Sequence, residues 1–162
     1  MSSKAFFLCL IAWSAALLVS AQDKPPVKFG NVSAKDFAPT MYPIDSNAQA
    51  VVIADIGYST IEGNNKNSFS VFFKRYRRVH ILNKNAFDVA TQAIYLGKDG
   101  QDEEEIEKIK AVTYNLENGK VVETKLDTKN GVFKENLNRQ TVVKKFTLPN
   151  IKEGSIIEYE YT

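Results

Sequence analysis

The sequence predicts an all-β protein, mainly antiparallel and folded as a sandwich or a strongly curved sheet, with one or two short helices after a signal peptide. Three observations lead to this fold class. Aromatic and β-branched residues gather in short runs, apolar and polar residues alternate within several runs, and turn residues separate them. Since no internal repeat or second-domain boundary is visible, residues 45–162 are expected to form one β domain.

The first 21 residues have the pattern of a cleavable signal peptide. Lys4 supplies a positive charge, Ala5–Val19 is an unbroken apolar run, and Val19-Ser20-Ala21 offers the small residues that signal peptidase requires. An uncleaved anchor is the weaker alternative, because a bilayer span needs roughly 20 apolar residues. Cys9 lacks the small preceding residue of a lipoprotein site. We therefore expect export to the periplasm, cell surface or medium, and no integral membrane segment after cleavage.

Residues 22–44 are expected to form a leader that contains a short helix. Ser33 can cap that helix, and Asp36 favours its positive N-terminal end. Pro39 then ends the helix early, and Pro43 keeps the following chain irregular.

The first strands of the β domain follow this leader. Ala50–Ile56 is an apolar run typical of a buried strand, and Gly63–Asn67 indicates a turn. Ser68–Leu82 is rich in aromatic and β-branched residues and predicts one long strand. Asn83–Asn85 closes it, and Val89–Leu96 is expected to return as the next strand.

The middle of the domain carries the clearest turn signal. Lys98–Glu105 is a solvated connection, and the spacing of apolar residues in Glu103–Lys110 allows one turn of helix. Residues 112–116 and 122–126 each alternate apolar with polar residues around Asn118-Gly119. Both turn residues tolerate the positive φ of a type I′ turn, so this segment predicts a β-hairpin.

The end of the sequence predicts two more strands. Val142–Leu148 alternates until Pro149, Lys152–Gly154 forms a turn, and Ser155–Tyr161 alternates again. Because the sequence stops at Thr162 within this pattern, the chain is expected to be truncated there. We expect the last strand to lack a partner, and an open sheet edge of this kind invites self-association.

The residues offer no recognisable catalytic or cofactor site. Cleavage removes the only Cys, and His80 is the only His, so a thiol nucleophile and a Cys/His zinc site are not expected. Asp99 and Asp102–Glu105 supply oxygen ligands that suit calcium, but their spacing does not fit an EF-hand, and a solvated face is favoured. Nucleotide-binding glycine motifs are absent as well. A hydrolase that depends on His80 is the weakest alternative.

The long strand carries a cluster of basic and aromatic residues that could contact a ligand or a neighbouring domain: Lys74, Arg75, Tyr76, Arg77, Arg78 and His80. Strand alternation places Arg75 and Arg77 on one face and the other four on the opposite face. Pairing with Glu158 or Glu160 across strands is the favoured interpretation, and an anionic surface ligand is the alternative. A net charge of +2 gives no general attraction to nucleic acid.

The sequence resembles a known family from about Asp45 to its end. The resemblance is carried by Tyr76–Asn83, Ile109–Asn115, Asn118–Glu123 and Phe146–Tyr159, of which the last is the most specific. Together they resemble an uncharacterised domain at the N-terminus of exported bacterial proteins, directly ahead of a transglutaminase-like domain.

This resemblance implies a non-catalytic β module that docks onto the downstream transglutaminase-like domain or positions its substrate. It also implies a Cys-His-Asp triad beyond residue 162, and none of the motif residues belongs to that triad. The alternative is a stand-alone extracellular binding domain for an anionic glycan or surface polymer, or for a cell-surface protein.

Overall fold

The structure is a computed structural model that describes residues 27–38, 45–64 and 68–162. The predicted signal peptide, residues 1–21, lies outside the described residues, as do Pro39 and Pro43. Within the described ranges, no helix is both long enough and apolar enough to cross a membrane.

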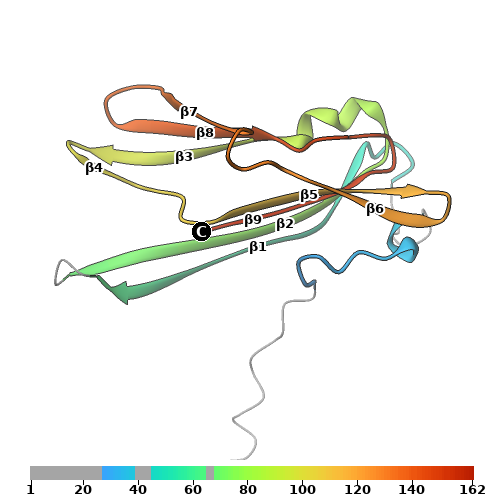
Figure 1. The fold of residues 1–162 in the computed structure, drawn as a ribbon, viewed down its shortest axis with the longest axis horizontal. Coiled ribbons are helices and arrows are strands. Elements are labelled where there is room, and N and C mark those ends of the chain that lie inside the picture. The colour runs from blue at the N-terminus through green and yellow to red at the C-terminus, as the bar shows by residue number, and fades with distance from the viewer. Residues whose placement is uncertain (1–26, 39–44, 65–67) are drawn as a thin grey trace, which may run out of the picture.

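Two antiparallel sheets lie one above the other (Figure 1). The larger sheet has the strand order β1 (Ala50–Gly63), β2 (Phe69–Ile81), β9 (Ile156–Tyr161), β5 (Ile109–Glu117), β6 (Lys120–Lys125). The smaller sheet has the order β4 (Asp102–Glu103), β3 (Thr91–Asp99), β8 (Thr141–Thr147), β7 (Val132–Asn136). Two short 3-10 helices, η1 (Ala34–Phe37) and η3 (Lys84–Ala90), complete the described fold. The predicted all-β class is confirmed.

Several local predictions are confirmed by the described backbone. The long strand is β2, and the helix after Ser33 is η1, where the Asp36 carboxylate accepts a hydrogen bond from the Ser33 backbone N–H at 2.6 Å. Asn118 and Gly119 have φ values of 51° and 77°, as a type I′ turn requires, and they join β5 to β6.

The prediction of an open edge at Ser155–Tyr161 is wrong. β9 pairs with β2, where Tyr161 lies opposite Arg75, and with β5, where the same residue lies opposite Ile109. The last strand therefore lies inside the larger sheet, between strands that precede it by dozens of residues. The expectation rested on the sequence stopping at Thr162, whereas both partners of this strand, β2 and β5, come from earlier in the chain.

Four further expectations differ from the structure. β1 continues past Ile56 to Gly63, because its second half pairs with the start of β2. β3 begins at Thr91 and pairs with β8 in the smaller sheet, so it does not pair with β2 of the larger sheet. Residues 104–108 do not form the helical turn that the sequence allowed, and they connect β4 of the smaller sheet to β5 of the larger sheet. The strand β7 was not predicted at all.

The main core lies between the two sheets. The larger sheet contributes Val79, Ile81, Ala111, Ile157 and Tyr159, and the smaller sheet contributes Ile94, Leu96, Val142 and Phe146. A second cluster lies on the outer face of the larger sheet, where Val112, Tyr114 and Ile156 pack under the segment that contains η1. The two sheets approach each other near η3 and separate toward the β1–β2 turn (Figure 1). The interior therefore opens as a wedge.

The hairpin turn gives a direct test of the backbone argument. We expect Gly119→Ala to lower the free energy of unfolding by about 1–2 kcal/mol, because an L-residue is strained at positive φ. Gly63→Ala is the matched control, since Gly63 also has open space around its Cα but lacks a positive φ. Urea denaturation of both variants measures the difference. Equal losses would contradict the assigned turn.

Candidate functional site

The basic residues of β2 divide between its two faces, as predicted. Arg75 and Arg77 lie on the face toward the smaller sheet, and both pair with Asp55 of β1. The Arg75 Nε and Nη2 atoms donate to the two Asp55 oxygens at 2.9 and 2.8 Å. These hydrogen bonds hold the pKa of Asp55 below its ordinary value. The two guanidinium groups therefore share one carboxylate.

The other four residues lie on the outer face. Lys74 Nζ lies 3.8 Å from Glu160, whose carboxylate also binds Lys110 at 2.7 Å. His80 is buried, and its ring packs edge-on against Phe37 at 6.1 Å between centroids. Tyr76 and Arg78 point toward Glu158. The predicted pairing of this strand with Glu158 and Glu160 is confirmed, and β2 does not form a free basic surface.

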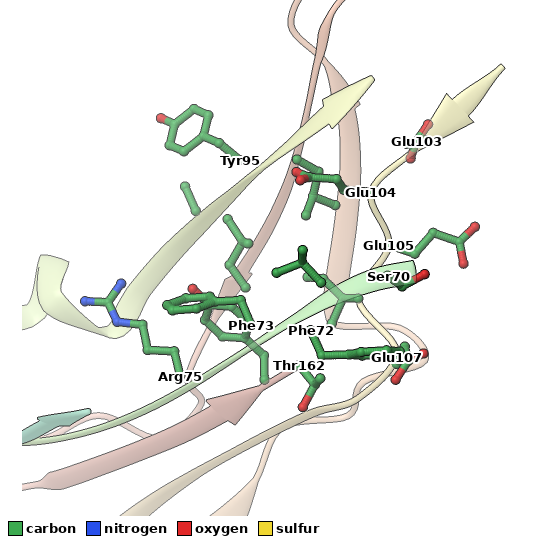
Figure 2. Close-up of a pocket in the computed structure, with 16 residues that line it drawn as sticks. Ser70, Phe72, Phe73, Arg75, Tyr95, Glu103, Glu104, Glu105, Glu107 and Thr162 are labelled. Carbon is green, nitrogen blue, oxygen red and sulfur yellow. The ribbon is translucent and has the colours of Figure 1, made fainter. Parts of the chain in front are cut away.

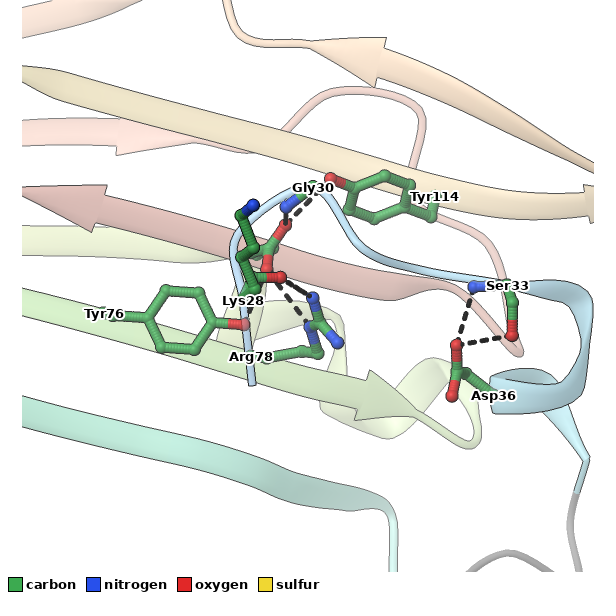
Figure 3. A network of polar contacts seen from close by, with 8 residues as sticks. Lys28, Gly30, Ser33, Asp36, Tyr76, Arg78 and Tyr114 are labelled. Atoms are coloured by element: carbon green, nitrogen blue, oxygen red, sulfur yellow. Dashed lines mark hydrogen bonds and ion pairs between the residues drawn. The ribbon is translucent and has the colours of Figure 1, made fainter. Parts of the chain in front are cut away.

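Glu158 is the centre of a buried polar cluster. Figure 3 labels residues around it, among them Gly30, Tyr76, Arg78 and Tyr114. Its carboxylate accepts hydrogen bonds from the Tyr76 hydroxyl at 2.6 Å and the Tyr114 hydroxyl at 2.8 Å. Arg78 donates to it from Nη2 at 2.6 Å and from Nε at 3.2 Å. The Gly30 backbone N–H donates at 2.8 Å. Three strands and the N-terminal segment thus meet at one fully buried carboxylate.

The chemistry of the cluster fits a role in holding the strands together. Burial, followed by hydrogen bonding to Glu158, raises the pKa of both Tyr76 and Tyr114, so both hydroxyls remain donors at neutral pH. The Arg78 guanidinium supplies the counter-charge that a buried carboxylate requires. Donors surround both carboxylate oxygens.

The N-terminal segment, residues 28–37, covers this cluster from outside. The Lys28 carbonyl accepts a hydrogen bond from Arg78 Nη2 at 3.0 Å, and Gly30 contacts Glu158 with φ at +81°. The Phe29 ring packs edge-on against Tyr76, and the Lys110 ammonium lies 5.1 Å from the centre of the same Phe29 ring. The segment therefore forms part of the folded domain and excludes water from the ion pair.

The acidic residues after β3 do not act as one group. Glu103 pairs with Lys134 at 2.6 Å, and Glu104 accepts a hydrogen bond from the Gly97 backbone N–H at 2.6 Å. Within residues 27–38, 45–64 and 68–162, no group of three or more His, Cys, Asp or Glu side chains is arranged to hold a metal ion.

A cleft of about 650 Å³ lies at the open side of the wedge (Figure 2). β2 lines one side with Ser70–Phe73 and Arg75, and β3 contributes Ile94 and Leu96. The segment 103–107 lines another side with four glutamates, and Thr162 lies at its end. Figure 2 shows Arg75 at the end of the cleft away from those glutamates.

The sequence analysis missed this cleft and the central role of Glu158. One signal for the cleft was present, because Phe69, Val71 and Phe73 alternate in the first half of β2 as Val79 and Ile81 do in its second half. Both sets point to the same face. The second set is buried and the first is exposed, a difference that alternation alone does not reveal.

Residues 67–162 match the DUF3857 family, which is described as a domain of unknown function. The match extends from just before β2 to the end of β9 and includes Arg78, Tyr114 and Glu158. Neither the curated proteins nor the solved structures contain a match to this chain.

The buried ion pair predicts a large loss of stability when one partner is removed. We expect Glu158→Gln to lower the free energy of unfolding by about 3–5 kcal/mol, because Arg78 keeps its charge in a buried place. The double variant Arg78→Met/Glu158→Gln should lose less than the sum of the two single variants, with a coupling of about 1–3 kcal/mol. Strictly additive losses in urea denaturation would argue against this pair as the centre of the cluster.

His80 predicts a defined pH dependence of stability, since it is the only His in the chain. Burial lowers the pKa of His80 below its ordinary value of 6.5. The unfolded state therefore binds more protons as the pH falls through 6.5, and stability declines. We expect the free energy of unfolding to fall between pH 7.5 and 5, and His80→Gln to reduce that slope. Parallel pH profiles for the two proteins would refute this.

Proposed function

The chain belongs to the DUF3857 family, and from this premise we propose that it is a non-catalytic β module of an exported transglutaminase-like protein. In this proposal the module docks onto the catalytic domain or positions its substrate. Export is supported by the signal-peptide pattern of residues 1–21, and the transglutaminase-like context by the resemblance of four sequence segments.

One observation carries the docking role. The β1–β2 hairpin exposes large apolar side chains on the face that continues the core: Ile61 is 70% exposed, Phe69 77% and Val71 69%. Ile61 lies directly opposite Val71, and Phe69 precedes Val71 by two residues, so the three side chains share one face. A contiguous exposed apolar surface of this kind is typical of an interaction site.

The motif segments support a role without catalysis. Tyr76–Asn83 contains Arg78, Ile109–Asn115 contains Tyr114, and Phe146–Tyr159 contains Glu158. All three segments therefore contribute to the buried cluster that joins the strands of the larger sheet. The segments that carry the resemblance therefore largely contain the residues that hold the larger sheet together.

An anionic glycan receives less support as the partner. The basic residues of β2 already pair with carboxylates: Lys74, Arg75, Arg77 and Arg78. Arg78 is also buried. A polyanion would have to displace these partners, at a desolvation cost, before it could use the strand.

The docking role can be tested in the longer protein that the proposal requires. We expect Phe69→Arg/Val71→Arg to leave the isolated chain within about 0.5 kcal/mol of the original, because both side chains are exposed. In the longer protein the same change should lower the melting temperature of the catalytic domain or narrow its substrate range.

Phe133→Arg is the matched control, since Phe133 is 67% exposed on β7 of the smaller sheet. It should change neither quantity. Melting curves and turnover that stay the same after Phe69→Arg/Val71→Arg, or after deletion of residues 27–162, would exclude the docking role.

A further inference from the structure

Two lysines lie at core-facing positions of the smaller sheet. Lys144 of β8 shares its face with Val142 and Phe146, which are both buried in the core. Directly opposite Lys144 lie Ile94 of β3, another core residue, and Lys134 of β7. The two lysines are therefore neighbours on the inner face of the sheet. Like charges in this arrangement destabilise strand pairing, so a role other than packing is indicated.

One carboxylate offsets part of this charge. Glu103 of β4 forms an ion pair with Lys134 at 2.6 Å. The hydrogen bond from Lys134, together with the charges of Lys98 and Lys144, holds the pKa of Glu103 below its ordinary value. Glu103 is therefore ionised at neutral pH and places one negative charge beside three lysines. Within residues 27–38, 45–64 and 68–162, Lys144 has no ion pair.

A pocket of about 520 Å³ lies beside the two lysines. Lys134 and Lys144 line it from the smaller sheet, and Lys108 lines it from the segment before β5. Thr128 contributes a hydroxyl, and Glu107 contributes a carboxylate that is exposed to solvent. The lining therefore carries a positive net charge, in a volume typical of small-molecule sites.

Lys134 and Lys144 are placed to bind one anionic group together. Residues directly opposite on neighbouring strands have Cβ atoms about 5 Å apart, so both ammonium groups can reach the same ligand. A carboxylate carries one negative charge and would neutralise one lysine, as Glu103 already does for Lys134. A phosphate group carries nearly two negative charges at neutral pH and offers several acceptor oxygens. Its charge therefore matches a pair of lysines better.

We propose that this pocket binds a small phosphate monoester, with the phosphate between Lys134 and Lys144. The organic part of the ligand packs against the apolar lining: Ile106, Ile109 and Val132. Lys108 and the Thr128 hydroxyl supply further donors for the phosphate oxygens. Water screens the repulsion from Glu107, because that side chain is exposed. The inference goes beyond the docking role and does not depend on it.

The test uses the full chain, labelled with nitrogen-15, and phenyl phosphate as the probe. Binding is followed through amide chemical shifts near neutral pH, with sodium chloride holding the ionic strength constant. We expect saturable shifts at Thr128, Lys134 and Lys144. Phenyl sulfate has nearly the same shape but one negative charge, so it should bind at least about fivefold more weakly. Inorganic phosphate should shift the same amides and bind more weakly than phenyl phosphate, because it lacks an apolar part.

Neighbouring lysines provide the matched pair of variants. Lys144→Met should lower the affinity for phenyl phosphate at least about tenfold, because a charge-assisted hydrogen bond is lost. Lys145→Met makes the same change in net charge one residue away. Lys145 lies on the opposite face of β8 and pairs with Glu135, so this variant should keep the original affinity within about twofold.

Stability separates binding from a structural role of Lys144. Lys144→Met should not lower the free energy of unfolding without ligand, because it removes the repulsion from Lys134 and keeps a long side chain. Phenyl phosphate should raise the melting temperature of the original chain and of Lys145→Met, and not that of Lys144→Met.

Three outcomes would overturn the proposal. The first is an absence of saturable shifts in the pocket, and the second is unchanged affinity in Lys144→Met. The third is equal affinity for phenyl phosphate and phenyl sulfate, which would exclude recognition of a second negative charge. Equal affinity for inorganic phosphate and phenyl phosphate would also contradict the monoester and assign the pocket to the free ion.

Discussion

The ion pair between Arg78 and Glu158 is the constraint on which the larger sheet depends. The two residues lie directly opposite each other on β2 and β9, and both are buried. A shift of β9 by one residue relative to β2 would turn Glu158 to the other face of the sheet, into the apolar core and away from Arg78. Since a buried charge without a partner costs several kcal/mol, the pair fixes the register of the two strands. Tyr114 then ties β5 to the same carboxylate, and Gly30 ties the N-terminal segment.

The pairing of the described residues differs along β2. β9 pairs with Arg75–His80 of β2, while β1 pairs with Phe69–Ile81. Among the described residues, the core lies beneath the half of β2 that pairs with both strands, and the cleft lies beside the half that pairs with β1. The apolar side chains of both halves belong to one continuous face. What changes along β2 is whether other residues cover that face: Val79 and Ile81 are buried, and Phe69 and Val71 are exposed.

Local features of the sequence predicted local structure well. Asn118-Gly119 specified a hairpin because only a few residues tolerate positive φ, and β2 was recognisable from its uninterrupted aromatic and β-branched content. The position of β9, by contrast, depends on pairing with residues far away in the sequence, which alternation does not encode. The pairing of the basic strand with Glu158 was predicted from its charge, but its burial was not. Glu158 alternates with Ile157 and Tyr159, so the sequence places it on the outer face of the sheet. That face is buried because the N-terminal segment, residues 28–37, covers it.

The central place of β9 also governs how the chain can fold. The Tyr76–Glu158 bond joins residues 82 apart in sequence, and the Gly30–Glu158 bond joins residues 128 apart. Contacts between such distant residues slow folding, because the entropy of closing a long loop must be lost before any contact forms. During synthesis, the larger sheet cannot be completed until residues 156–161 have emerged, and until then β2 and β5 lack the strand that joins them.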